Sequence, residues 1–267
     1  MKTKFSINAT RSVLAFQRFS ALARAGFTLV ELLIVIAVIA TLAALLMPVF
    51  HSVTIHSVLQ RAQSERAQIE TAIQNYYSDR GFYPPGNALA SPTSMGWART
   101  NQLFYELEGT TTTNFGFAGV ANGGLSFTTL DRASTVVASP AMISAFHVTS
   151  FMNYTKGGAE DSKPAKNYLP GLPASRMATN TILGFQGYNI AEDDYVILVT
   201  AARSDPNYKP LPGIVTFTGA NANPWRYLCP GVHNPNSYDL WIQIFVGGKT
   251  NLISNWKTDP EVNPALP

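Results

Sequence analysis

The chain has very little cysteine and few charges. Of its 267 residues only Cys229 is a cysteine, which excludes an intrachain disulfide and a cysteine-based metal site. We interpret Cys229 as a small buried hydrophobic residue. Charged residues make up 13% of the sequence and apolar residues 46%, so the composition is that of one folded unit with an apolar segment and not of a disordered chain.

The sequence also lacks the motifs of common enzyme classes. No Gly-x-Ser-x-Gly elbow is present, and a phosphate-binding loop at 246–250 is excluded because Gln243 stands where that motif needs glycine. Three consecutive acids at 192–194 precede an expected strand, a pattern typical of a solvated turn. Four histidines have no spacing that indicates a zinc site or a catalytic base: His51, His56, His147 and His233. We therefore predict that the protein is not an enzyme.

Acidic residues are absent from the first 26 positions, where five basic residues occur: Lys2, Lys4, Arg11, Arg18 and Arg24. Without this segment, 14 of the 19 basic residues remain against 16 acidic ones, so the rest of the chain has a net charge near −2. The pI near 8.9 therefore reflects the N-terminal segment. We predict no nucleic-acid partner from it.

A long apolar run follows this basic segment. Residues 27–50 contain a single charge, Glu31, and a helix of that length would span roughly 36 Å, enough to cross the core of a bilayer. In an ordinary secretory signal the small-residue cleavage site follows the apolar core, whereas here Ala25-Gly26 precedes it. Cleavage after Gly26 would leave the apolar helix on the protein, so we predict that the helix is membrane-embedded at some stage.

The residues around this site carry a specific resemblance. The string Gly26-Phe27-Thr28-Leu29-Val30-Glu31, after a basic leader, resembles the cleavage and methylation signature of type IV prepilins and type II secretion pseudopilins. The resemblance implies that a prepilin peptidase cuts between Gly26 and Phe27 and N-methylates Phe27. It also implies that Glu31 of one subunit pairs with the new α-amine of a neighbour and sets the register of a filament.

Two residues of the apolar run have physical consequences of their own. A carboxylate in an apolar helix is costly unless it is paired, so Glu31 is expected to have a partner; a protonated or snorkelling carboxyl is the alternative. Pro48 lacks an N–H group and is expected to kink the helix. Pilins commonly place a proline at this depth, although a proline simply tolerated in a membrane helix would give the same sequence.

Beyond Pro48 the pattern becomes amphipathic. Apolar residues recur at spacings near three and four: Val58, Ala62, Ile69, Ile73 and Tyr76 or Tyr77. Charged residues lie between them. The helix is predicted to continue to about Arg80. Gly81 can adopt the left-handed cap, and Pro84 prevents continuation.

This helix end also carries a motif. Tyr76, Asp79, Gly81, Tyr83 and Pro84 resemble the Y-x-x-D-x-G-x-Y-P motif of the major pseudopilin of type II secretion, the G subunit. A second block occurs in the same order in that family: Asn223-Pro224-Trp225, Pro230-Gly231, Tyr238 to Trp241 and Ile253 to Trp256. The resemblance favours that subunit over other members of the family.

The G subunit often binds calcium through an acidic loop in its C-terminal region. Here the corresponding loop, 247–252, contains Lys249 and no carboxylate, and only Asp239 and Asp259 lie nearby in sequence. Calcium prefers several carboxylate and carbonyl oxygens, so this departure argues against calcium binding. We predict no cofactor and no metal ligands.

The remaining sequence predicts a small sheet with a long insertion. Alternation along 240–246 and the Gly247-Gly248 pair predict a C-terminal β-hairpin, and 195–200 and 214–218 are further strand candidates. A short helix is expected over 95–107, ended by Gly109. The stretches 109–129 and 156–174 are interpreted as surface loops that carry either filament decoration or a partner contact.

Together these patterns predict an α+β, pilin-like fold: a long N-terminal helix packed on a small antiparallel sheet, with a loop-rich insertion. The expected divisions are a cleaved leader at 1–26, a transmembrane and filament-core helix at 27–50, its amphipathic continuation at 51–84, the insertion with part of the sheet at 85–222, and the C-terminal hairpin region at 223–267.

The predicted function is that of a structural subunit of a type II secretion pseudopilus, held by a single span in the bacterial inner membrane with its head in the periplasm before assembly. The implied partners are prepilin peptidase, further copies of the chain, minor pseudopilins, the inner-membrane assembly platform and membrane lipid. The alternative is a type IV pilin or minor pilin for adhesion, motility or DNA uptake. The heads of such pilins often close a C-terminal loop with a disulfide, which a single cysteine excludes here.

Overall fold

The structure, a computed structural model, describes residues 28–93, 95–115, 124–132, 134–138, 140–155, 163–181, 194–200, 216–217 and 223–264. The predicted leader, the residues Gly26 and Phe27, the first two acids of 192–194 and parts of the insertion lie outside this range. The chain divides into two compact units, Met1–Val49 and Phe50–Pro267.

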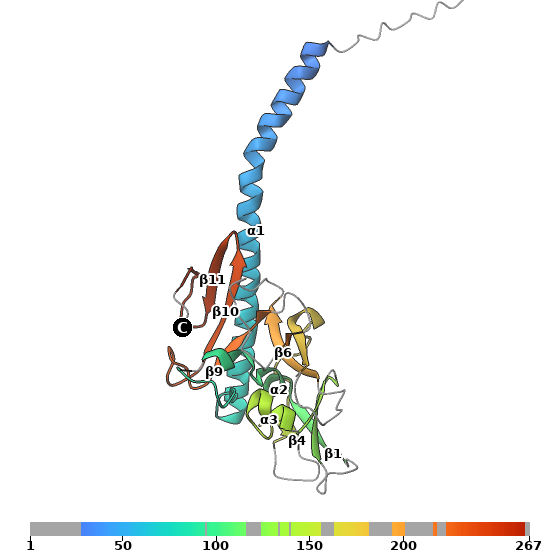
Figure 1. The fold of residues 1–267 in the computed structure, drawn as a ribbon, viewed down its shortest axis with the longest axis vertical. Coiled ribbons are helices and arrows are strands. Elements are labelled where there is room, and N and C mark those ends of the chain that lie inside the picture. The colour runs from blue at the N-terminus through green and yellow to red at the C-terminus, as the bar shows by residue number, and fades with distance from the viewer. Residues whose placement is uncertain are drawn as a thin grey trace, which may run out of the picture. The chain divides into compact units, whose positions relative to one another are not determined.

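Helix α1 runs from Leu29 to Arg80 (Figure 1). In the second unit its buried apolar residues share one face at the predicted spacing: Ala62, Ile69, Ala72, Ile73 and Tyr76. The helix ends as predicted, because Gly81 has a φ of 83° and donates its N–H group to the Tyr77 carbonyl at 2.7 Å. The amphipathic continuation and its stop are therefore confirmed.

The strands among the described residues of the second unit form three four-stranded sheets, where the sequence predicted one small sheet. The first has the order β3-β2-β1-β4, with β3 (Thr135–Val137), β2 (Gly124–Thr129), β1 (Thr110–Phe115) and β4 (Tyr154–Thr155). The second has the order β7-β5-β6-β8, with β7 (Thr216–Phe217), β5 (Met177–Thr181), β6 (Asp194–Thr200) and β8 (Asn223–Pro224). The third has the order β12-β11-β10-β9, with β12 (Glu261–Val262), β11 (Lys249–Ser254), β10 (Asp239–Val246) and β9 (Arg226–Leu228).

The expectation of a surface loop over 109–129 was wrong for the described residues. Strands β1 and β2 pair antiparallel from Thr110↔Thr129 to Phe115↔Gly124. Threonine is β-branched and suits a pleated strand, and hydroxyl pairs such as Thr113 with Ser126, 2.6 Å apart, link the two strands. The interpretation failed because it treated threonine as a loop-forming polar residue.

The helix expected over 95–107 is divided in two. A 3₁₀ turn, η1 (Met95–Arg99), precedes α2 (Leu103–Glu108). Asn101 separates them, because its amide donates to the Ala98 and Trp225 carbonyls at 2.8 and 3.0 Å while its oxygen accepts from the Leu103 N–H group at 3.2 Å. The other helical elements in the described ranges are α3 (Pro140–Phe146) and η2 (Ala174–Arg176).

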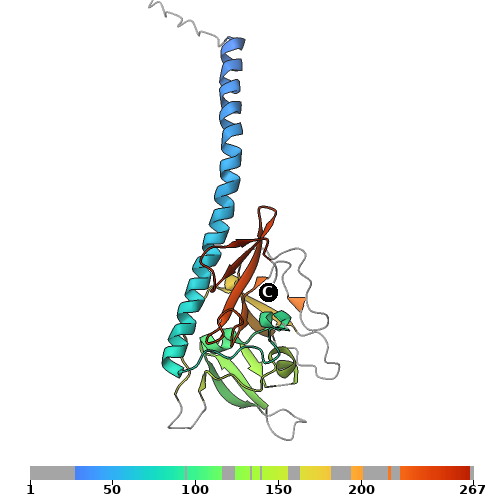
Figure 2. The ribbon, with the colours of Figure 1, turned by 90° about the vertical axis from the view of Figure 1, so that its left-hand side faces the viewer.

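The C-terminal hairpin is confirmed and lies alongside α1 (Figure 1 and Figure 2). Strands β10 and β11 pair from Trp241↔Ser254 to Val246↔Lys249, and both glycines of the turn have positive φ. The predicted face of Leu240, Ile242 and Ile244 joins the main core, while Trp241 packs with Ala98, Leu228 and Leu252 on the other side. The sheet is therefore buried on both faces, which rigidly places the hairpin against the rest of the second unit.

Candidate functional site

The N-terminus of α1 is closed by a local cap between Thr28 and Glu31. The Glu31 carboxylate accepts from the Thr28 N–H and hydroxyl groups, both at 2.8 Å, and the Glu31 N–H group donates to the Thr28 hydroxyl at 3.2 Å. This reciprocal arrangement is a capping box and satisfies donors that a helix start leaves unpaired. In the subunit Glu31 thus has a partner of its own, one turn away from the predicted cleavage point.

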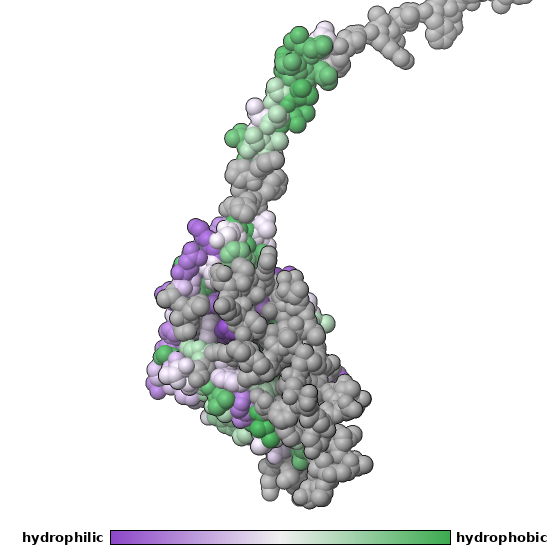
Figure 3. Space-filling view, in the orientation of Figure 1, coloured by the Kyte–Doolittle hydropathy of each residue, from purple (hydrophilic) through white to green (hydrophobic). Residues whose placement is uncertain are grey.

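The segment of α1 that follows is apolar on all sides and exposed. Leu29 is 78% exposed, Ile36 57% and Leu45 71%. Figure 3 shows this hydrophobic surface along the N-terminal part of the helix. A contiguous apolar surface of this kind marks a site that another protein or a membrane covers.

Among the described residues, none of the helices has the combination of length and hydropathy that crossing a membrane requires. The transmembrane role expected for 27–50 therefore stays a prediction. Helix α1 is continuous through position 48. The kink expected at Pro48 also stays a prediction.

The motif at the end of α1 holds several elements together. Tyr76 is fully buried and donates its hydroxyl to Glu106 of α2 at 3.0 Å. Asp79 forms an ion pair with Lys166, which lowers the pKa of the Asp79 carboxyl. Both contacts join α1 to segments far away in sequence, so Tyr76 and Asp79 have structural tasks beyond stopping the helix.

The same motif contacts the C-terminal block. The Tyr227 hydroxyl donates to the Pro84 carbonyl at 2.6 Å, and the rings of Tyr83 and Tyr238 lie 5.2 Å apart. Tyr83 also stacks on Tyr77, with ring centroids 4.3 Å apart. The two sequence blocks that carry the G-subunit resemblance are therefore neighbours in the fold.

Glu106 is the first of two residues that sequence reasoning missed. Its carboxylate is fully buried and accepts from the Met152 and Asn153 N–H groups at 2.7 and 2.9 Å, besides the Tyr76 hydroxyl. Burial raises the pKa of Glu106 to about 7, and the three donors limit the rise. The only sequence signal was an acid between Tyr105 and Leu107, both of which are core residues.

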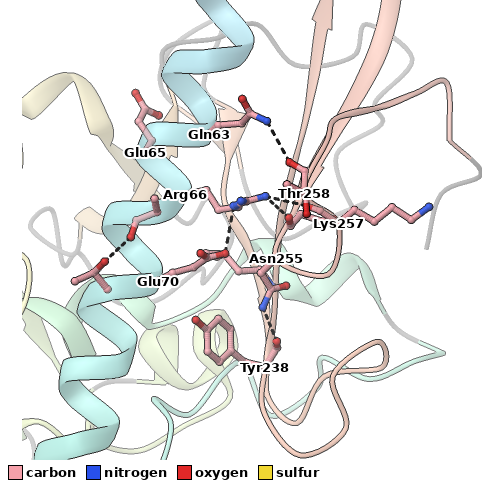
Figure 4. Close-up of polar contacts among 12 residues, drawn as sticks. Gln63, Glu65, Arg66, Glu70, Tyr238, Asn255, Lys257 and Thr258 are labelled. Carbon is pink, nitrogen blue, oxygen red and sulfur yellow. Dashed lines mark hydrogen bonds and ion pairs between the residues drawn. The ribbon is translucent and has the colours of Figure 1, made fainter.

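A second missed residue is Arg66, which clamps the C-terminal loop to α1 (Figure 4). Its guanidinium group donates to the carbonyl oxygens of Ser254 and, at 3.1 Å, Lys257, and lies 3.2 Å from the Glu70 carboxylate. One turn earlier, Gln63 donates to the Thr258 carbonyl at 3.3 Å. Burial raises the pKa of Glu70, and Arg66 partly offsets that rise.

Replacing Arg66 with methionine is expected to lower the free energy of unfolding by about 2 kcal/mol, because it leaves two loop carbonyls without their charged donor. Urea unfolding measures this loss. Lys257→Met is the matched control, because it removes one positive charge from the C-terminal loop that Arg66 contacts. The ion pair of Lys257 with Glu261 is exposed and is expected to contribute under about 1 kcal/mol. Equal losses in both variants would contradict a clamp by Arg66.

Asp239 organises the loop that precedes β10. Its buried carboxylate accepts from the N–H groups of Val232, His233 and Asn234 at 2.7, 2.9 and 3.0 Å. A Cβ atom on Gly231 would lie 2.5 Å from the Asp239 Oδ1 atom, so this position requires glycine. Both carboxylate oxygens thus bind the protein's own N–H groups, an arrangement that suits a structural role better than a calcium ligand.

Within the described ranges, no three His, Cys, Asp or Glu side chains gather where they could hold a metal ion. His147 caps α3, because its backbone N–H group donates to the Ile143 carbonyl at 2.8 Å. The ring of His233 stacks on the ring of Trp256, with the ring centroids 3.9 Å apart. Cys229 is partly buried, and burial raises the pKa of its thiol.

Comparison with known proteins adds to this geometry. Residues 22–47 match the family profile described as the Prokaryotic N-terminal methylation motif. Over 102 residues the chain is 34% identical to the fimbrial protein EcpC of Eikenella corrodens, covering 37% of this chain and 67% of that protein. No solved structure matches the chain.

Two further relatives match over shorter stretches. The type IV major fimbrial protein FimA of Dichelobacter nodosus is 36% identical over 78 residues, covering 29% of this chain and 44% of that protein. The type IV major pilin protein PilE1 of Neisseria gonorrhoeae is 37% identical over 71 residues, covering 26% of this chain and 33% of that protein. The chain therefore spans less than half the length of these two relatives.

Proposed function

Because the chain belongs to the type IV pilin family, we propose that it is the structural subunit of a pilus-like filament that assembles through the N-terminal part of α1. The observation that carries this proposal is the exposed apolar surface from Leu29 to Leu45, which lies within the residues that match the methylation motif and contains one acid, Glu31. The relatives are structural filament proteins by name, and an enzymatic role has no support from them.

Processing comes first in the proposed sequence of events. Prepilin peptidase cleaves between Gly26 and Phe27 and methylates the new amine of Phe27. The apolar helix then keeps the subunit in the inner membrane, with the head in the periplasm, until the assembly platform and minor subunits incorporate it into the filament. In both environments the same residues are removed from water, which accounts for an apolar surface on every side of the helix.

Glu31 is proposed to change partners during assembly. In the subunit its carboxylate accepts two hydrogen bonds from Thr28. In the filament it would pair with the α-amine of Phe27 on a neighbouring subunit. An ion pair shielded by apolar side chains is strong only when the two groups meet directly, so it would select one axial offset between subunits.

The pilus takes precedence over the pseudopilus that the sequence motifs favoured. The named relatives are a fimbrial protein and type IV major pilins, and they give no support to an assignment specific to the G subunit. A pseudopilus of type II secretion stays as the second candidate, supported by the contact between the two resembling blocks through Tyr83 and Tyr238. Deletion of the gene separates the two: loss of surface fibres supports the pilus, and retention of secreted proteins in the periplasm supports the pseudopilus.

The processing step gives the test of the proposal. Intact-mass and N-terminal peptide mass spectrometry of the protein from its native membrane should find a chain that begins with methylated Phe27. Gly26→Ala should accumulate as the full-length precursor, heavier by its leader, because a side chain at the cleavage position blocks the peptidase. Ala23→Ser, a change within the leader, should be processed normally. An uncut wild-type chain, or one cut beyond Phe50, would contradict the proposal.

A further inference from the structure

A cleft of about 340 Å³ lies beside the C-terminal end of α1 in the second unit. Its walls come from two segments more than eighty residues apart in sequence. Asp79 and Arg80 belong to α1, and Lys163, Lys166 and Tyr168 belong to the segment that follows the first sheet. Since the cleft involves neither the methylation motif nor the exposed part of α1, what it binds is a separate question from assembly.

The cleft has an excess of positive charge. Three cationic side chains line it, against the single carboxylate of Asp79, so two positive charges are not balanced within the lining. The buried Glu106 lies within electrostatic range of Arg80, and because its pKa is raised to about 7 it is only partly ionised at neutral pH and offsets less than one of these two charges. The cleft therefore keeps a net positive charge at neutral pH.

Each of these cations also has donors to spare. Lys163 donates to the Asp79 carbonyl and Lys166 to the Asp79 carboxylate, which uses one of the three N–H groups of each ammonium. Arg80 donates through one terminal nitrogen to Asn153 and to the Pro164 carbonyl. The contacts hold the cations in place at the cleft and leave further N–H groups for a ligand.

The end of a helix normally disfavours an anion, because its last carbonyl groups carry partial negative charge. Here two of these carbonyls are already bonded: the Tyr77 carbonyl accepts from Gly81 and the Asp79 carbonyl accepts from Lys163. The unfavourable dipole is thus partly satisfied by the protein itself. The three full charges then outweigh it.

We propose that this cleft binds a doubly charged tetrahedral oxyanion, either free phosphate or the terminal phosphate of a larger molecule. A dianion matches the two unbalanced charges, and ammonium and guanidinium groups are the usual donors to phosphate oxygens. A phosphodiester carries a single charge for each phosphate group and matches the cleft less well.

Calorimetric titration of the full chain in detergent with inorganic phosphate, at constant ionic strength, tests the proposal. The wild type should show saturable binding with a Kd below about 10 mM. Replacing both lysines, in Lys163→Gln with Lys166→Gln, should weaken binding at least about tenfold. Lys249→Gln, in the turn between β10 and β11, removes one positive charge outside the cleft and should leave the affinity unchanged.

Further measurements separate binding from folding and identify the source of the phosphate. Lys166→Arg keeps the charge and should keep the affinity, and phosphate should raise the melting temperature of the wild type but not of the double variant. A terminally phosphorylated oligonucleotide should bind more tightly than the same strand without its terminal phosphate. Absence of saturable binding of inorganic phosphate, or equal affinity in the double variant, would overturn the proposal, and equal binding of the two oligonucleotides would identify free phosphate as the ligand.

Discussion

Glu31→Ala should leave cleavage after Gly26 intact and abolish filaments. The expected loss at each subunit contact is about 3 kcal/mol, because the α-amine of a neighbouring Phe27 would remain in an apolar environment without its partner. A loss of this size raises the subunit concentration needed for assembly by about 100-fold. Electron microscopy of sheared surface fractions, combined with the N-terminal mass, checks both halves of this expectation.

The capping box provides a matched control for this experiment. Glu31→Gln keeps an acceptor for the Thr28 N–H and hydroxyl groups, so the start of α1 should stay capped, but it removes the charge. We expect Glu31→Gln to fail in assembly as Glu31→Ala does. Normal filaments from Glu31→Gln would mean that Glu31 serves only to cap its own helix, and the proposed pairing between subunits would be wrong.

Glu106→Ala should lower the free energy of unfolding of the head by about 3 to 5 kcal/mol, because three buried donors lose their shared acceptor. The donors are the Met152 and Asn153 N–H groups and the Tyr76 hydroxyl. Tyr76→Phe removes one donor and should cost about 1 to 2 kcal/mol. A double-mutant cycle by urea unfolding should find the two changes strongly non-additive.

The loss in Glu106→Ala should also depend on pH. The pKa of Glu106 is raised from 4.5 to about 7 in the folded state, so the folded protein binds the proton more tightly than the unfolded chain. The contribution of Glu106 to stability is then highest below pH 4.5 and falls by up to about 3 kcal/mol as the pH rises to 7, above which it levels off. Glu106→Ala should remove this contribution and therefore cost more at pH 5 than at pH 8.

A remaining slope is expected from Glu108, whose pKa burial also raises to about 7. Glu108→Gln in the Glu106→Ala background should flatten the profile further. If Glu106→Ala left the wild-type slope unchanged over pH 5 to 8, the carboxyl of Glu106 would not be the group that titrates.

Long and periodic features were predictable from the sequence. The apolar spacing from Ala62 to Tyr76 repeats over several turns, so the buried face of α1 followed from it, and Gly81 with Pro84 located its end. The alternation from Leu240 to Ile244 and the two glycines after it located the hairpin. In each case local geometry and burial favour the same conformation, which is when sequence patterns are most informative.

Features made by distant contacts were not predictable. Nothing near Glu106 in sequence indicates that the backbone at 152–153 will supply its donors, and nothing near Arg66 indicates that the carbonyls of Ser254 and Lys257 will meet it. The G-subunit assignment was too specific for a related reason. The motif residues Gly81, Tyr83 and Pro84 cap a helix and pack it on a C-terminal sheet, which is a structural task and does not by itself specify the G subunit.

The hairpin and its flanking residues contact the second half of α1 and the residues just after it at three places along the helix. The turn approaches so closely that a Cβ atom on Gly247 would lie 2.5 Å from Ile55, the Ser254 carbonyl meets Arg66, and Tyr238 meets Tyr83 just beyond the helix end. A force pulling on α1 along its axis would act on all three joints at once, in shear, and would not peel them apart one by one. A filament subunit built in this way can transmit tension from its helix to its head without unravelling.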